Sequence, residues 1–190
     1  MASWLMKILY PKLRLALLPI MLGYAGLGGL LAGLYGIVHD QITYSISHEY
    51  FTRFKFLQFH YANFGWPPRV LVAEIGFLAT WWVGFFSAWF IARLTVPAFS
   101  RVAAFRHSLR GFTVILIATL AAALVGYVIG VRHSADYPAW QDLAVTLGVV
   151  DLPSFVRVAY IHNASYFGCL MGLVVAIVYI RRCRVQKPSC

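Results

Sequence analysis

The sequence is poor in charged residues, and acidic residues are especially rare. Asp, Glu, Lys and Arg make up 12% of the 190 residues, whereas hydrophobic residues make up 61%. A soluble domain carries about 25% charged residues, so this composition excludes an ordinary soluble domain. The net charge is +10, but the basic residues flank long apolar runs and form no patch, which argues against nucleic acid as a partner. We therefore expect the main partner to be the lipid bilayer.

Cysteine is scarce as well, and most motifs that identify a catalytic or cofactor site are missing. The three cysteines, at 169, 183 and 190, lie outside the segments predicted to face outward, so no disulfide framework is expected there. The motifs CxxC, CxxCH, HxxxH, HExxH, ExxH and GxSxG are absent, as is a Walker-type loop. Most histidines fall at the ends of apolar runs, which disfavours a haem held between two histidines. Any metal site must come from residues that tertiary structure brings together.

Long apolar segments, in contrast, are plentiful. Four of them are long enough to cross a bilayer, which takes about 20 residues, and we place them near 15–38, 70–92, 112–131 and 158–180. We interpret the first as a membrane span and not as a cleaved signal. The sequence therefore predicts an all-α integral membrane protein, a four-helix bundle that forms a single domain over 1–190.

The basic residues are distributed asymmetrically about these spans. Eleven of the sixteen lie in the two tails and in the loop between the second and third spans, where no acidic residue occurs. All six acidic residues fall on the other side, in or near the loops 39–69 and 132–157. The positive-inside rule then places both termini in the cytoplasm and these two loops outside. We expect a multi-pass protein of the bacterial inner membrane.

The two outward loops are expected to contain amphipathic, interfacial segments. In the first, Ser47 is expected to cap a helix with Glu49 in its first turn. The segment "EYFTRFKFLQFHY" would then carry its aromatic residues on the outer leaflet or over the end of the bundle, with an alternating strand as the alternative. The predicted apolar face of this helix consists of Tyr50, Phe54, Leu57 and Tyr61, while Arg53 and Lys55 reach toward the lipid headgroups. The second loop is expected to contain a short amphipathic element that ends before Pro153.

The first span is rich in glycine at helical spacing. Small residues at this spacing let a second helix approach closely. We expect this face to pack against another helix of the bundle or, alternatively, against another copy or another membrane subunit. The residues concerned are Gly26, Gly29, Gly33 and Gly36.

Each predicted span carries titratable side chains at its outward end. Polar groups at this depth are costly and need partners or a function, and imidazole and carboxylate together suit zinc, iron or copper. The candidate metal ligands are His39, Asp40, Glu74, His133 and His162. Candidate supporting residues are His48, Glu49, His60, Tyr166, Cys169 and Arg132. Among these, His162, Tyr166 and Cys169 share one helical face.

Several functions fit this pattern. The first is a metal-binding membrane protein that acts at the outer leaflet, whether or not it is an enzyme. A second is a proton-sensitive transporter or channel, although the nearly apolar inner halves of the spans argue against a full pore. A third is a non-catalytic subunit or assembly factor of a membrane complex. A structural alternative is that Glu74 pairs with Arg69, Arg132 or a histidine and only neutralises charge.

Overall fold

The computed structural model describes residues 14–133 and 138–185, and within these ranges the chain is helical and contains no strand. Four helices are long and apolar enough to cross a membrane, namely α2 (Leu18–Ile46, preceded by the 3-10 turn η1, Leu15–Leu17), α4 (Pro68–Thr95), α5 (Arg101–Arg132) and α7 (Leu152–Val185). The four predicted long apolar helices are confirmed. Much of the two basic tails used to predict the orientation, including Lys7, Lys12 and Lys187, lies outside the described residues.

The helices are longer than the apolar runs that predicted them. The first run loses its apolar character near 38, but α2 continues to Ile46, so His39 and Asp40 lie within a regular helix and not in a loop. Hydropathy measures the part of a helix that suits lipid, whereas the helix itself continues as long as its backbone hydrogen bonds and its packing allow. This extension positions the candidate site.

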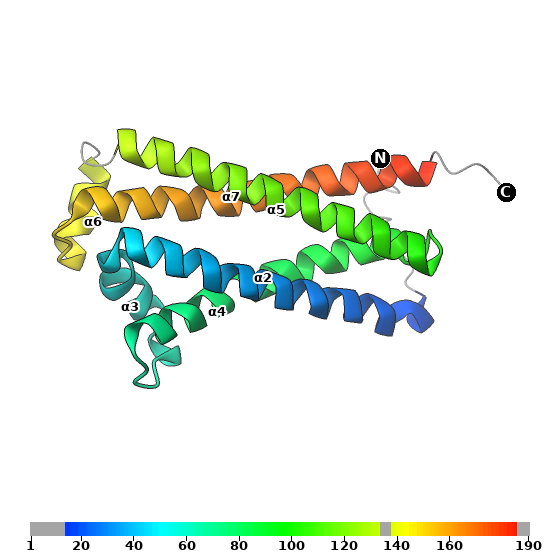
Figure 1. Cartoon of the computed structure of the whole chain (residues 1–190), viewed down its shortest axis with the longest axis horizontal. Helices are drawn as coiled ribbons and strands as arrows, with labels where there is room; N and C mark the ends of the chain where they lie inside the picture. Colours follow the sequence, from blue (N-terminus) through cyan, green and yellow to red (C-terminus); the bar gives the residue numbers. More distant parts are fainter. Residues whose placement is uncertain (1–13, 134–137, 186–190) are drawn as a thin grey trace, which may run out of the picture.

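The four long helices form two tightly packed pairs. Helix α2 packs along α4, and α5 packs along α7, while the contacts between the two pairs are far fewer. Figure 1 shows the four helices side by side, with the start of α2 and the end of α7 at the same end of the molecule. Loose contact between the pairs leaves space in the middle of the bundle.

Glycines make the close approach within the first pair. A Cβ atom added to Gly36 would collide with the Gly76 carbonyl of α4, and one added to Gly33 would collide with the Phe77 ring. Across this contact, the Thr80 hydroxyl donates a hydrogen bond to the Ala32 carbonyl at 2.8 Å. The predicted packing role is therefore confirmed within the chain for Gly29, Gly33 and Gly36. Gly26 is exposed, and none of the described residues places an atom near its Cβ position, so contact with another copy or subunit stays a prediction for this residue.

The connection between α2 and α4 begins as predicted and then departs from the prediction. Ser47 caps the segment, since its hydroxyl accepts a hydrogen bond from the Tyr50 amide at 3.3 Å. From there the backbone forms a π-helix (η2, Tyr50–Lys55), followed by the short helices α3 (Phe56–Gln58) and η3 (His60–Ala62). The strand alternative is excluded.

The π-helix changes which side chains face inward. Because its hydrogen bonds connect residues i and i+5, Tyr50, Phe51 and Lys55 are buried, whereas Leu57 and Tyr61 of the predicted apolar face are 63% and 64% exposed. The prediction of a single α-helical face is therefore wrong. The inward side chains cap the end of the bundle in a cluster of buried residues that consists of Tyr44, Tyr50, Phe51, Val72, Phe155, Val158 and Ala159.

The second connection packs onto the same cluster. It forms the helix α6 (Pro138–Leu147), whose Trp140, Leu143 and Leu147 contact the cluster. The Glu49 carboxylate joins the two connections, because it accepts hydrogen bonds from the Val150 amide at 3.0 Å and the Asp151 amide at 2.6 Å. Glu49 thus holds the start of α7 in place, in a position where a negative charge is favourable.

A candidate metal centre and its cavity

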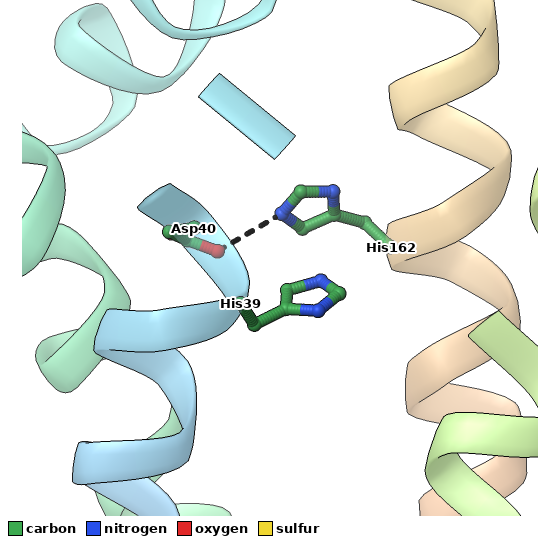
Figure 2. A group of neighbouring side chains, drawn as sticks. All are labelled: His39, Asp40 and His162. Carbon is green, nitrogen blue, oxygen red and sulfur yellow. Dashed lines mark hydrogen bonds and ion pairs between the residues drawn. The ribbon is translucent and has the colours of Figure 1, made fainter. Parts of the chain in front are cut away.

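The structure brings three of the predicted ligands together between the two helix pairs. His39 and Asp40 come from α2 and His162 comes from α7, and Figure 2 shows the two imidazole rings projecting into the same space. One ligand atom from each of the three lies within 4.8 Å of the others. Asp40 and His162 are buried, with 3% and 5% of their surface exposed, while His39 is half-buried.

The hydrogen bonds of His162 determine where its protons lie. Its Nδ1 lies 3.0 Å from the Val158 carbonyl, and because a carbonyl only accepts, Nδ1 must carry a hydrogen. Its Nε2 lies 3.2 Å from Oδ1 of Asp40, the contact drawn as a dashed line in Figure 2. In a neutral ring this Nε2 would present a lone pair to a carboxylate oxygen, and the two would repel each other. A positive charge, either a proton or a metal ion, must therefore lie between these atoms.

His39 adds a nitrogen that the protein leaves without a partner. Its Nδ1 is 3.4 Å from the Tyr35 hydroxyl, and its ring stacks on the Tyr35 ring with 5.5 Å between centroids. Its Nε2 is buried and has no hydrogen-bond partner, which costs about 1–3 kcal/mol when nothing binds there. The ring lies 4.9 Å from that of His162, and one nitrogen of His39 belongs to the same group.

Two histidines and one carboxylate are a familiar ligand set for zinc and for non-haem iron. Ligands about 2.0–2.1 Å from a tetrahedral metal ion lie about 3.3 Å apart, and the distance between Nε2 of His162 and Oδ1 of Asp40 is 3.2 Å. Three protein ligands leave at least one coordination position open, as in catalytic zinc sites. The donor set, and the spacing of Asp40 and His162 within it, thus fit a transition-metal ion.

A cavity of about 360 Å³ lies between the helix pairs and reaches this group, a volume within the range of about 300–1,000 Å³ for small-molecule sites. His39, Asp40 and His162 line one part of it, and Tyr166 and Cys169 line it further along α7. The rest of the wall is mainly apolar and includes Leu31, Ala79, Val83, Leu109, Phe112 and Leu116. The group therefore lies at the polar end of a largely apolar cavity.

Lys55 lines the same cavity, and the sequence did not reveal it as a site residue. The predicted extension of its side chain toward lipid headgroups is wrong, because only 7% of its surface is exposed. Its ammonium group donates to the Gln58 side-chain oxygen at 3.1 Å and lies 5.6–6.0 Å from the ring centroids of Tyr50, Phe54 and Phe59. Burial lowers the pKa of Lys55, while the charge of Asp40 opposes this effect.

Tyr50 covers the outward side of His162. The two rings stack with 4.9 Å between their centroids and 28° between their planes. Burial raises the pKa of the Tyr50 hydroxyl, so this group stays neutral in the physiological range. Tyr50 is therefore an uncharged aromatic residue that covers one face of the His162 ring.

The remaining candidates lie elsewhere. His133 is exposed at the end of α5, as is Arg132, and His48 and His60 are exposed in the first connection. Glu74 does not belong to the ligand group, and one of its oxygens is buried without a hydrogen-bond partner. The predicted pairing of Glu74 with Arg69 is wrong, since Arg69 instead bonds to Gln41 and Ser45. Among the described residues, the His162–Asp40 contact is the only ion pair.

Comparison with known proteins does not extend these observations, since the chain matches no protein-family model, no curated protein and no solved structure. The arguments on function therefore rest on the geometry of the site.

Proposed function

We propose that this multi-pass membrane protein binds one transition-metal ion through His39, Asp40 and His162, at the polar end of its central cavity. The observation that carries this proposal is the contact between Nε2 of His162 and Oδ1 of Asp40. Because Nδ1 is already a donor to Val158, the contact requires a cation between the two atoms. A metal ion supplies that cation and accepts both atoms as ligands.

The unpartnered nitrogen of His39 favours a metal ion over a proton. A proton between Asp40 and His162 satisfies those two residues but leaves Nε2 of His39 buried and without a partner. A metal ion also uses a nitrogen of His39, and coordination through Nε2 would remove a cost of about 1–3 kcal/mol. Zinc, iron and copper all accept this donor set.

The open coordination position is what would give the site a chemical activity. Three protein ligands with a free position are typical of catalytic sites, whereas structural zinc sites are closed by four. A metal ion held here would polarise an oxygen atom of a bound molecule. The cavity walls exclude water from that position, and Tyr50 shields the site from the outward side.

The charge distribution of the chain supports a location for this site. The basic tails and the basic loop between α4 and α5 favour the cytoplasmic side of a bacterial inner membrane, with both termini inside. The ends of α2 and α7 that carry the ligands would then lie near the outer leaflet, where a lipid or another small molecule could reach them.

A second function is supported by the same contact. If a proton and not a metal ion joins Asp40 and His162, the pair is a proton-responsive switch between α2 and α7, which belong to different helix pairs. Loss of that proton would leave two acceptors facing each other and would push the pairs apart. This second function predicts no bound metal.

Metal analysis of the purified protein separates the two functions. We expect about one zinc, iron or copper ion per chain in detergent after reconstitution and removal of excess metal, measured by plasma mass spectrometry. His39→Ala, Asp40→Asn and His162→Ala should each lose the ion, whereas His133→Ala, a histidine on the exposed end of α5, should retain it. A folded wild-type protein that binds no metal ion under these conditions would overturn the proposal in favour of the proton-responsive pair.

A further inference from the structure

A smaller cavity adjoins the main one between α2 and α5. The smaller cavity, of about 80 Å³, shares Leu31, Leu109 and Phe112 with the main one and extends to Tyr24. Along α2, the distance from His39 to Tyr24 is roughly 22 Å at about 1.5 Å per residue. This is a large part of the hydrocarbon thickness of about 30 Å. The two cavities together form a long, narrow and largely apolar space with one polar end.

This space opens sideways between α2 and α5. Leu31 and Leu109 line both cavities, and yet 47% and 55% of their surface is exposed. Leu116, which lines the main cavity, is 45% exposed. Helices α2 and α5 belong to different pairs and make few contacts with each other. The opening therefore lies among apolar side chains in the membrane-spanning part, so a molecule dissolved in lipid can enter without passing through water.

The polar end of the space carries an unbalanced positive charge. The Lys55 ammonium group is buried in the cavity wall, and among the described residues no carboxylate lies within ion-pair distance of it. The single carboxylate of the group, that of Asp40, already faces His162. A buried cation without a counter-ion is costly, and a bound anion removes that cost.

We infer that this space binds a single-chain amphiphile with a carboxylate head, a fatty-acid-like molecule that enters from the lipid between α2 and α5. Its chain lies along the apolar walls, and its head contacts Lys55 beside the proposed metal position. Lys55 is the only Lys or Arg among the described residues that line the cavity, so without a metal ion the single negative charge of a carboxylate matches this wall better than the charge of a phosphate does. The inference rests in part on the proposed function, since a metal ion at the head would be a second cationic contact.

Binding of radiolabelled palmitate to the detergent-solubilised protein tests this inference. We expect saturable binding, competition by unlabelled palmitate, weaker competition by cetyl phosphate, and none by butyrate or cetyltrimethylammonium. Lys55→Met should weaken palmitate binding by about tenfold or more through loss of a charge-assisted contact. The matched control is Arg53→Met, an exposed cation of the same segment that should bind palmitate as the wild type does.

A second variant tests the chain end of the site independently of the charge. Val83→Phe places a larger side chain in the cavity wall, away from the three ligands, and should reduce palmitate binding while metal content stays unchanged. Non-saturable palmitate binding, an unchanged affinity in a folded Lys55→Met protein, or better competition by cetyl phosphate would each overturn the inference.

Palmitate binding, measured before and after a chelator removes any bound metal ion, separates this inference from the metal proposal. If the protein holds a metal ion but does not bind palmitate, the inference fails and the metal centre stands. If palmitate binds with Lys55 dependence to a protein that binds no metal, the amphiphile site stands and the proposed metal function fails.

Discussion

Metal binding at this site should release one proton from the Asp40–His162 contact. Nδ1 of His162 keeps its hydrogen, because it donates to the Val158 carbonyl at 3.0 Å. The proton that can leave is the one between Nε2 and Oδ1, which are 3.2 Å apart. A metal ion that takes both atoms as ligands must displace it. In the pH range in which His39 is neutral, that residue releases no further proton.

One released proton sets the pH dependence of the affinity. The dissociation constant for the metal ion should fall about tenfold for each unit by which the pH rises, or about 1.4 kcal/mol of binding free energy per unit. The affinity rises with pH because the proton and the metal ion compete for the same two atoms: a lower pH favours the proton and a higher pH favours the metal ion.

Calorimetric titration of zinc into the metal-free protein measures the number of protons released directly. Titrations at one pH in buffers with different ionisation enthalpies give a slope equal to the number of protons released. We expect a slope of about one for the wild type and for the exposed control His133→Asn, and little binding for Asp40→Asn. Tight zinc binding with no proton release would refute the reasoning, because it would show that no proton joins Nε2 of His162 to Asp40.

Three further predictions concern the parts of the fold that support the site. Phe51→Ala should lower the free energy of unfolding by about 3–5 kcal/mol, because Phe51 is fully buried in the cluster over the site. The control Phe64→Ala, at a residue 73% exposed, should change this free energy by less than about 0.5 kcal/mol. Thermal unfolding in detergent compares the two variants, and equal effects would contradict the packing described. Gly36→Leu should separate α2 from α4 and lower the melting temperature, whereas Gly26→Leu should not, since of these two residues only Gly36 meets the backbone of α4. If the Gly26→Leu protein instead loses an oligomeric state in size-exclusion chromatography, this position contacts another subunit. Burial lowers the pKa of Lys55 below its ordinary 10.5, so the unfolded chain binds this proton more tightly, and stability should rise as the pH increases from the folded-state pKa toward 10.5. Denaturation at several pH values should show this rise in the wild type and no such rise in Lys55→Met. An identical pH dependence in both proteins would contradict the burial of a charged lysine.

Local features of the chain were predictable because they depend on few neighbours. The four spans follow from the length of the apolar runs, and the shared face of His162, Tyr166 and Cys169 follows from helical spacing alone, since all three line the cavity. The Ser47 cap is a local signal too, and the structure confirms it. The length of α2 was not predictable in this way, because the helix continues past 38, where the apolar run ends and Gln41 bonds to Arg69 of α4.

The order of residues along the chain by itself determined that this is a helical protein with four segments suited to a membrane, and that its acidic residues and most of its histidines gather toward one end of those segments. Only the tertiary structure decided which of them meet. Five residues were equal candidates as ligands, and the rotation of α2 and α7 about their own axes selects His39, Asp40 and His162 while leaving Glu74 and His133 outside. That rotation depends on glycine contacts between distant segments, and the inward turn of Lys55 depends on a π-helix that an α-helical reading of the pattern does not anticipate. Both result from packing across the bundle, where small shifts of whole helices decide which side chains come within bonding distance.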